Sequence, residues 1–149
     1  MAYIMPNKGH PRYVRTGGEL SMAIGRSLLF AVGLIIPTLA AVVMLPKQMG
    51  LELLSLLLTF IAGVYGGFAL LDARKREFAI EMLGILVTFA LAAAALWASP
   101  VYLAAGYIFH GLWDVLHHPK GIQTVIPCGY APFCLIFDIP VGLFIFFWW

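Results

Sequence analysis

Charged residues are scarce in this chain. They make up 11% of its 149 residues, whereas 62% are hydrophobic, and soluble globular domains carry about 25% charged residues. So few charges could not cover a surface that faces water. This shortage excludes an ordinary soluble domain and favours lipid as the surrounding solvent. At this length we expect a single domain.

Long basic runs and a cysteine framework are also missing. The net charge is only +2, and the basic residues are not interleaved with aromatics, so the sequence does not indicate nucleic-acid binding. The two cysteines, Cys128 and Cys134, are six apart, a spacing that suits neither a zinc ribbon nor a thioredoxin-type motif. We expect inert thiols, with a disulfide as the alternative if their loop faces an oxidising compartment.

The N-terminus lacks the features of a signal peptide. Residues 1–19 have no central apolar stretch and no small-residue cleavage site, and they contain Lys8, Arg12 and Arg15 together with prolines and glycines. We therefore expect a polar tail that stays on the mature protein, followed by a helical domain over residues 20–149.

What the chain does contain is a series of five long apolar segments. A helix needs roughly 17–25 apolar residues to cross the hydrocarbon core of about 30 Å, and the last two segments are near the lower limit. The sequence thus predicts an all-α membrane protein, a bundle of about five transmembrane helices. The expected spans lie near 27–45, 51–71, 78–98, 101–116 and 132–149.

Proline, glycine and charge interrupt these segments. Pro37 should kink the first span, which membrane bundles tolerate, and Pro100 suits the first turn of the fourth helix. Gly63 and Gly67 form a small-xxx-small pattern that permits close helix contact. We expect that contact inside the bundle, with a dimer contact as the alternative. The charged stretch 72–77 is expected to be a solvated loop.

The distribution of lysine and arginine predicts the orientation. If the N-terminus is cytoplasmic, eight basic residues lie inside and only Lys47 lies outside, which is the bias that cytoplasmic loops show. The expectation is a multi-pass protein of the inner (plasma) membrane with its C-terminus outside. The inner basic residues are Lys8, Arg12, Arg15, Arg26, Arg74, Lys75, Arg76 and Lys120.

One predicted span carries a concentration of ionisable residues. Such residues are rare within membranes and usually mark functional sites. His110 and Asp114 are four apart, and His117 and His118 follow one turn later. Residues three or four apart share a helix face, so these side chains should line one stripe, which is typical of helical metal sites.

The next helix adds a carboxylate at a matching depth. His110 lies about 13 Å before Pro119, and Asp138 lies about 9 Å beyond Pro132, at 1.5 Å per residue. Because the connecting loop brings those two helix ends together, His110 and Asp138 should face each other. Glu81 enters from the same side of the membrane, about one turn into the third span.

This combination of residue types suits a divalent metal. Two histidines with two or three carboxylates are typical ligands of Zn, Fe or Mn. A bound cation would neutralise buried carboxylates, and it could lower the pKa of a bound water to near 7 for hydrolysis or oxidation of a lipid-soluble substrate. The expected ligands are His110, Asp114, His118 and Asp138, and the catalytic or supporting candidates are Glu81 and His117.

The same residues also fit a polar network without metal, which would fix helix packing or serve a partner. Asp114 could pair with a histidine of its own helix, and Asp138 could pair with Arg26 in the first span. The two adjacent histidines could contact water and lipid head groups. Glu81 could favour the positive end of its helix dipole. Both interpretations remain open at this point.

The last 45 or so residues carry a resemblance. The run 110–118, followed by Pro127, Pro132, Cys134 and Asp138, resembles a pattern in small uncharacterised bacterial membrane proteins, which implies no established activity. The run also resembles the histidine-rich motifs of membrane desaturases and hydroxylases. Only three histidines are suitably placed here, so a di-iron centre is disfavoured and a mononuclear or mixed carboxylate–histidine site is left.

Three functions remain compatible with the sequence. The first is a metal-dependent enzyme that acts on a lipid-phase substrate. The second is a non-catalytic accessory subunit of a larger membrane complex, since five short helices leave little room to enclose a substrate. The third is a small oligomeric transporter with an intramembrane proton or cation path, although paired broken helices and an inverted repeat are lacking. The expected partners are the lipid bilayer and either other membrane subunits or further copies of this chain.

Overall fold

The fold is a bundle of five helices. The computed structural model describes residues 17–117, 121–127 and 129–149, and within them every regular element is a helix. The predicted all-α architecture is therefore confirmed. Residues 1–16, which make up most of the expected tail, lie outside the described residues. The helices are α1 (Gly17–Met44), α2 (Lys47–Asp72), α3 (Lys75–Trp97), α4 (Val101–Leu116) and α5 (Tyr130–Trp148).

Four of the helices are long and apolar enough to cross a membrane by length and composition. α4 is shorter, with 16 residues, or about 24 Å at 1.5 Å per residue. Large apolar side chains cover the outside of the bundle: Met44 is 86% exposed and Phe147 is 81% exposed. A soluble monomer rarely shows apolar surface on this scale, and acyl chains cover such a surface favourably.

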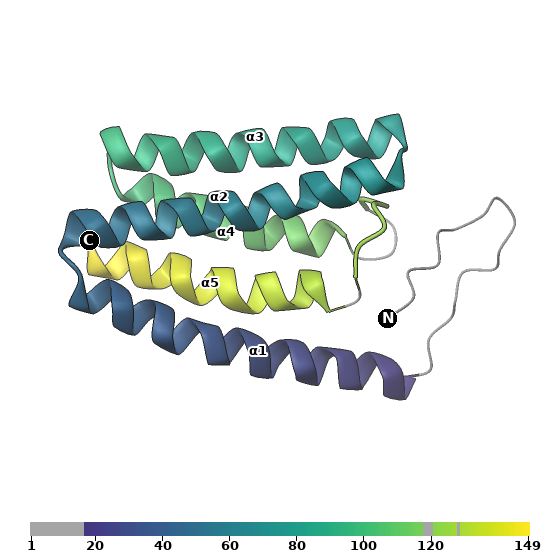
Figure 1. Cartoon of the computed structure of the whole chain (residues 1–149), viewed down its shortest axis with the longest axis horizontal. Coiled ribbons are helices and arrows are strands. Elements are labelled where there is room, and N and C mark those ends of the chain that lie inside the picture. Colours follow the sequence, from purple (N-terminus) through teal and green to yellow (C-terminus); the bar gives the residue numbers. More distant parts are fainter. Residues whose placement is uncertain (1–16, 118–120, 128) are drawn as a thin grey trace, which may run out of the picture.

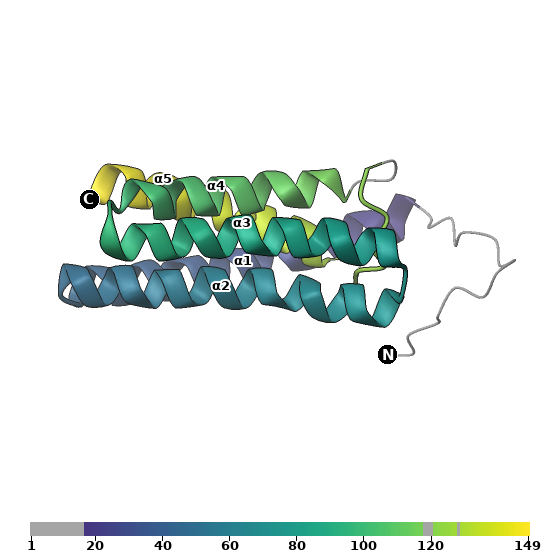
Figure 2. The same ribbon diagram turned by 90° about the horizontal axis from the view of Figure 1, so that it is seen from above.

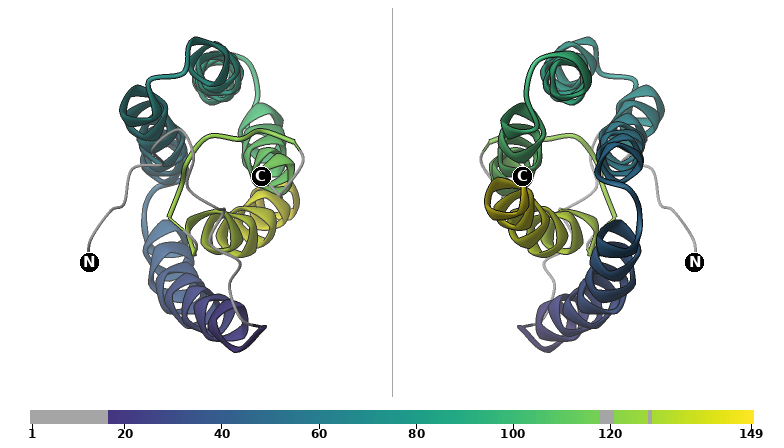
Figure 3. Two further views of the ribbon diagram at one scale, coloured as in Figure 1. Left: turned by 90° about the vertical axis from the view of Figure 1, so that its right-hand side faces the viewer. Right: turned by 90° about the vertical axis from the view of Figure 1, so that its left-hand side faces the viewer.

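The helices lie roughly parallel to one long axis (Figure 1, Figure 2). Seen along that axis they form a ring in chain order, with α5 returning to contact α1 (Figure 3). The start of α1, the connection from α2 to α3 and the segment 121–127 all lie at one end of the bundle, which we call the loop end (Figure 1). The C-terminus and the connection from α1 to α2 lie at the opposite end.

The interior divides into an apolar half and a polar half. The apolar half lies at the end of the bundle opposite the loop end. There the side chains of Leu54, Leu58, Leu103 and Val141 are fully buried. The Tyr107 hydroxyl lies next to them and donates a hydrogen bond to the Leu54 carbonyl oxygen, at 2.9 Å. The buried ionisable side chains gather nearer the loop end. The apolar half therefore holds the helices together, and the polar half contains the candidate site.

Prolines set two helix starts and do not interrupt the helices that contain them. Pro46 and Pro100 precede the first residues of α2 and α4, respectively. The connection before α2 is thus shorter than the gap between the predicted spans 27–45 and 51–71, because α2 already begins at Lys47. α1 continues through Pro37 as one helix, and the kink expected there stays a prediction.

The glycines of α2 do not all pack as the small-xxx-small pattern suggested. A Cβ atom at Gly66 would meet the side chains of Met82 and Ile85 at 3.3 Å, so this glycine lies against α3. A Cβ atom at Gly63 or Gly67 would have no described heavy-atom neighbour within 4 Å. Residues four apart share a helix face, and this pair faces outward. The predicted contact of the pair inside the bundle is therefore wrong.

Candidate metal centre

α4 and α5 bring three ionisable side chains together in the polar half. His110 and Asp114 are one turn apart on α4, and Asp138 lies opposite on α5. The Nδ1 atom of His110 is 2.6 Å from Oδ2 of Asp138 and 3.7 Å from Oδ2 of Asp114. All three side chains are buried. Three of the four predicted ligands thus form one cluster, and the fourth, His118, lies outside the described residues.

Each member of this cluster keeps one buried atom that has no hydrogen-bond partner among the described residues. These atoms are Nε2 of His110, Oδ2 of Asp114 and Oδ1 of Asp138. Buried polar atoms are normally paired. One ligand atom from each residue lies within 4.8 Å of the others. Two ligands on a metal with bonds of about 2.1 Å are at most about 4.2 Å apart, so the cluster needs to close only slightly to hold an ion.

A glycine on α4 permits the close approach of α5 at this depth. A Cβ atom at Gly111 would lie 3.0 Å from a methyl carbon of Ile139 and 3.4 Å from Cβ of Asp138. The absent side chain lets Asp138 reach His110, as the depth estimate from the sequence predicted. Asp138 pairs with His110 and not with Arg26, which is exposed on α1.

A second buried pair, formed by Glu81 on α3 and His117 at the end of α4, lies beside the cluster. Nε2 of His117 is 2.7 Å from Oε1 of Glu81, and both side chains are at most 1% exposed. Nδ1 of His117 is 3.1 Å from the Trp113 carbonyl oxygen. That oxygen only accepts, so Nδ1 carries a hydrogen. His117 is therefore not an interfacial side chain, and both its ring nitrogens already have partners.

Trp113 links this pair to α3. Its indole N–H donates to Oε2 of Glu81 at 3.2 Å, so both carboxylate oxygens of Glu81 are engaged. A Cβ atom at Gly84 would lie 2.6 Å from carbon atoms of the indole ring, and side-chain Cβ atoms in proteins essentially never come within 3.0 Å of another side chain. The missing side chain at Gly84 therefore provides the space in which Trp113 reaches Glu81.

Tyr65 on α2 joins the two groups, and sequence reasoning did not select it. Its hydroxyl donates to Oδ1 of Asp114. Its ring lies between two imidazoles, with ring centroids 5.7 Å from His110 and 4.7 Å from His117. The available signal was a tyrosine flanked by small residues in the middle of an apolar span, where its hydroxyl needs a buried partner.

The segment 121–127 crosses the loop end of the bundle (Figure 3, left). Two carboxylates hold its backbone: Oε2 of Glu77 accepts from the Gln123 N–H at 3.0 Å, and Oδ2 of Asp72 accepts from the Val125 N–H at 2.8 Å. The segment is thus fixed across the polar half on the side where Glu81 and His117 lie.

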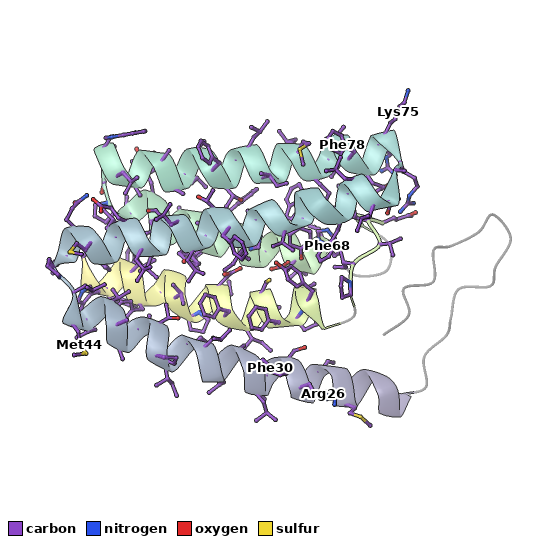
Figure 4. The ribbon with its side chains drawn as sticks, viewed as in Figure 1. Arg26, Phe30, Met44, Phe68, Lys75 and Phe78 are labelled. Atoms are coloured by element: carbon purple, nitrogen blue, oxygen red, sulfur yellow. The ribbon has the colours of Figure 1, made fainter. Side chains whose placement is uncertain are left out.

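Arg74 completes this attachment from the connection between α2 and α3. Its guanidinium donates to the Asp72 carboxylate and to the Gln123 carbonyl oxygen. The hydrogen bond with Asp72 raises the pKa of Arg74 above its usual value. Only part of the charged stretch is solvated as predicted: Lys75 points away from the bundle (Figure 4), whereas Glu77 is 3% exposed, because it binds a backbone N–H of the crossing segment.

Among the described residues, Cys134 is not a member of the cluster. Cys134 is a buried free thiol on α5, one turn before Asp138. Cys128 lies outside the described residues.

Comparison with known proteins identifies the family but supplies no activity. A family described as having unknown function, DUF6010, matches residues 26–148. No curated protein and no solved structure matches the chain. The matched range covers most of α1 and the whole of the polar half, including the cluster and the Glu81–His117 pair. The chain therefore belongs to the family of unknown function DUF6010.

Proposed function

We propose that this membrane protein is metal-dependent and that His110, Asp114 and Asp138 hold one divalent cation. The observation that carries the proposal is the buried cluster itself: one potential ligand atom from each residue lies within 4.8 Å of the others, and each carboxylate keeps one oxygen without a hydrogen-bond partner among the described residues. One imidazole nitrogen and two carboxylate oxygens suit Zn, Fe or Mn.

Charge balance supports a divalent ion. Two carboxylates, those of Asp114 and Asp138, are buried with one imidazole, and burying an uncompensated charge is costly. A divalent cation with a neutral His110 brings the charge of the cluster to zero. The neighbouring Glu81 and His117 form a pair that can balance its own charge. The cluster and this pair then carry no net charge against the apolar helices around them.

The chemistry that such an ion supplies is the activation of water. A bound divalent cation lowers the pKa of its water toward 7 and so provides a nucleophile for hydrolysis. Because the outside of the bundle is apolar, we propose a lipid-phase substrate. Glu81 and His117, which share the polar half with the cluster, are the candidates for accepting a proton.

We place the cluster toward the cytoplasmic face of the plasma membrane. Among the described residues, Arg74, Lys75 and Arg76 lie at the loop end, and Lys47 lies at the opposite end, where its ammonium is over the Trp148 ring at 5.3 Å. This asymmetry supports a cytoplasmic loop end. The C-terminus of the chain is then outside.

Metal analysis of the purified protein tests the proposal. We expect about one equivalent of Zn, Fe or Mn per chain, since the site has one set of ligands, and a loss of most of it in His110→Ala and Asp138→Asn. Elemental analysis by mass spectrometry measures both. Glu81→Gln is the matched control, because it removes a buried carboxylate beside the cluster and should keep the metal. Substoichiometric metal in the unmutated protein would refute the proposal.

A second candidate, a subunit of a larger membrane assembly, is favoured by the outward face of α2. Gly63 and Gly67 face away from the bundle next to Phe60, which is 71% exposed, and outward glycines at this spacing let another helix approach. We expect Gly63→Leu to dissociate such an assembly in native gels after purification in mild detergent, while Leu86→Ala, a change of an exposed side chain on α3, should not. A monomer in both unmutated and substituted protein would remove this candidate.

A further inference from the structure

Tyr65 is the one side chain from α2 that contacts the candidate ligands through its hydroxyl. The hydroxyl donates to Oδ1 of Asp114, while Oδ2 of the same carboxylate has no partner among the described residues. The two oxygens of Asp114 therefore have different tasks. Oδ1 is engaged by a neutral donor, and Oδ2 lies 3.7 Å from Nδ1 of His110.

The ring of Tyr65 is held so that its hydroxyl cannot swing away. Tyr65 is 1% exposed. Besides the two imidazoles, its ring meets Phe68 edge-on at 6.1 Å and Tyr130 edge-on at 5.4 Å between centroids. Aromatic contacts on several sides fix the ring plane and with it the direction of the hydroxyl.

In Asp138, Oδ2 contacts Nδ1 of His110, which is itself a candidate ligand, and Oδ1 has no partner among the described residues. The group that engages Asp114, by contrast, is not a candidate ligand. Residues that orient metal ligands in this way commonly set ligand geometry and affinity. In Asp114 the orienting group comes from another helix, 49 residues earlier in the sequence.

We propose that Tyr65 is a positioning residue of the metal centre, which holds Asp114 so that the carboxylate binds the cation through Oδ2 alone. This inference rests on the proposed function. With each of the three ligands binding through a single atom, the protein fills three positions, and the ion keeps a position for water or a substrate oxygen. Sites with three protein ligands and an open position are typical of catalytic zinc.

The substitution Tyr65→Phe tests this role, because it removes the hydroxyl and keeps the ring. We expect the affinity for Co²⁺, used as a spectroscopic probe, to fall about 10- to 100-fold. The visible absorption of the bound Co²⁺ should weaken as Asp114 becomes bidentate and the coordination number rises. Titration of the metal-free protein with Co²⁺ gives both quantities.

Tyr107→Phe is the matched control. Tyr107 is equally buried, and its hydroxyl donates to the Leu54 carbonyl oxygen and not to a ligand. We expect its Co²⁺ affinity and spectrum to match those of the unmutated protein, even if both variants lower the melting temperature of the metal-free protein. Equal Co²⁺ affinity and equal spectra in the two variants would overturn the inference while leaving the metal site intact.

A measurement on the unmutated protein covers the case in which Tyr65→Phe does not fold. Infrared difference spectra of the zinc-loaded and metal-free protein, with ¹³C-labelled aspartate, report how carboxylates bind. We expect widely separated symmetric and antisymmetric bands, the signature of one-oxygen binding. Narrowly separated bands would overturn the role of Tyr65. Failure of the unmutated protein to bind any metal would instead refute the proposed function, and this inference with it.

Discussion

Replacing His117 with alanine is expected to lower the free energy of unfolding by about 3–5 kcal/mol. His117 is the charge partner of Glu81 at 2.7 Å, and the carboxylate is fully buried. Without the imidazole, Glu81 loses its charge partner and must either remain charged in an apolar interior or take up a proton. Unfolding in mixed micelles with increasing sodium dodecyl sulfate measures the loss.

A double substitution separates the charge effect from the loss of packing. Glu81→Gln removes the carboxylate charge, so the combination with His117→Ala should be less destabilised than the sum of the two single changes. We expect a coupling energy of about 1–3 kcal/mol, as for residues in one hydrogen-bond network. Additive effects, or a loss below about 1 kcal/mol in His117→Ala, would show that Glu81 and His117 do not form a buried pair.

The depth of the cluster could be predicted because it depends only on the number of residues between each side chain and the loop that joins the two helices. Two helices joined by a loop start from the same level, and the rise per residue fixes how deep each side chain lies. His110 and Asp138 could therefore be matched from the sequence, and their contact at 2.6 Å agrees with that estimate. The helices were predictable for the same kind of reason, since the length of an apolar run limits where a span can lie.

The rotation of each helix about its axis could not be predicted in this way. In lipid the outside of a bundle is as apolar as its core, so hydrophobic periodicity does not reveal the inward face. The rotation of α2 places Gly63 and Gly67 on its outward face and Tyr65 on its inward face. The pairing of Glu81 with His117 joins positions 36 residues apart on helices whose rotation the sequence leaves open.

The buried polar groups form two units, the cluster of His110, Asp114 and Asp138 and the pair of Glu81 and His117, and each unit contains residues from two helices. α4 supplies the imidazoles of both units, α5 adds Asp138 to one, and α3 adds Glu81 to the other. α2 contributes Tyr65, which contacts both units through its ring and one through its hydroxyl. A change in the packing of α3 against α4 should therefore disturb the Glu81 unit first and leave the candidate ligands on α4 and α5 in place.

Gly84→Ala makes that change with a single methyl group. The added Cβ atom would lie 2.6 Å from the Trp113 ring, so the indole must move and its hydrogen bond to Glu81 is lost. We expect a destabilisation of about 2–4 kcal/mol, from overpacking together with the loss of a hydrogen bond to a charged group. Unfolding in sodium dodecyl sulfate gives the magnitude, and a shift in tryptophan emission reports the displaced ring.

Gly63→Ala is the control for the effect of the substitution itself. Its Cβ atom meets no described atom within 4 Å, so alanine should leave stability unchanged or raise it by up to about 1 kcal/mol through helix propensity. Trp113→Leu in the Gly84→Ala background should remove the clash, so the second change destabilises less than it does alone. Gly84→Ala could instead have the same stability as Gly63→Ala and keep the tryptophan emission of the unmutated protein. That result would show that Trp113 does not pack in the space beside Gly84, and it would contradict the described contact between α3 and α4 that orients Glu81. Metal content that stays near one equivalent in Gly84→Ala, as in Glu81→Gln, would show in addition that the two units are independent.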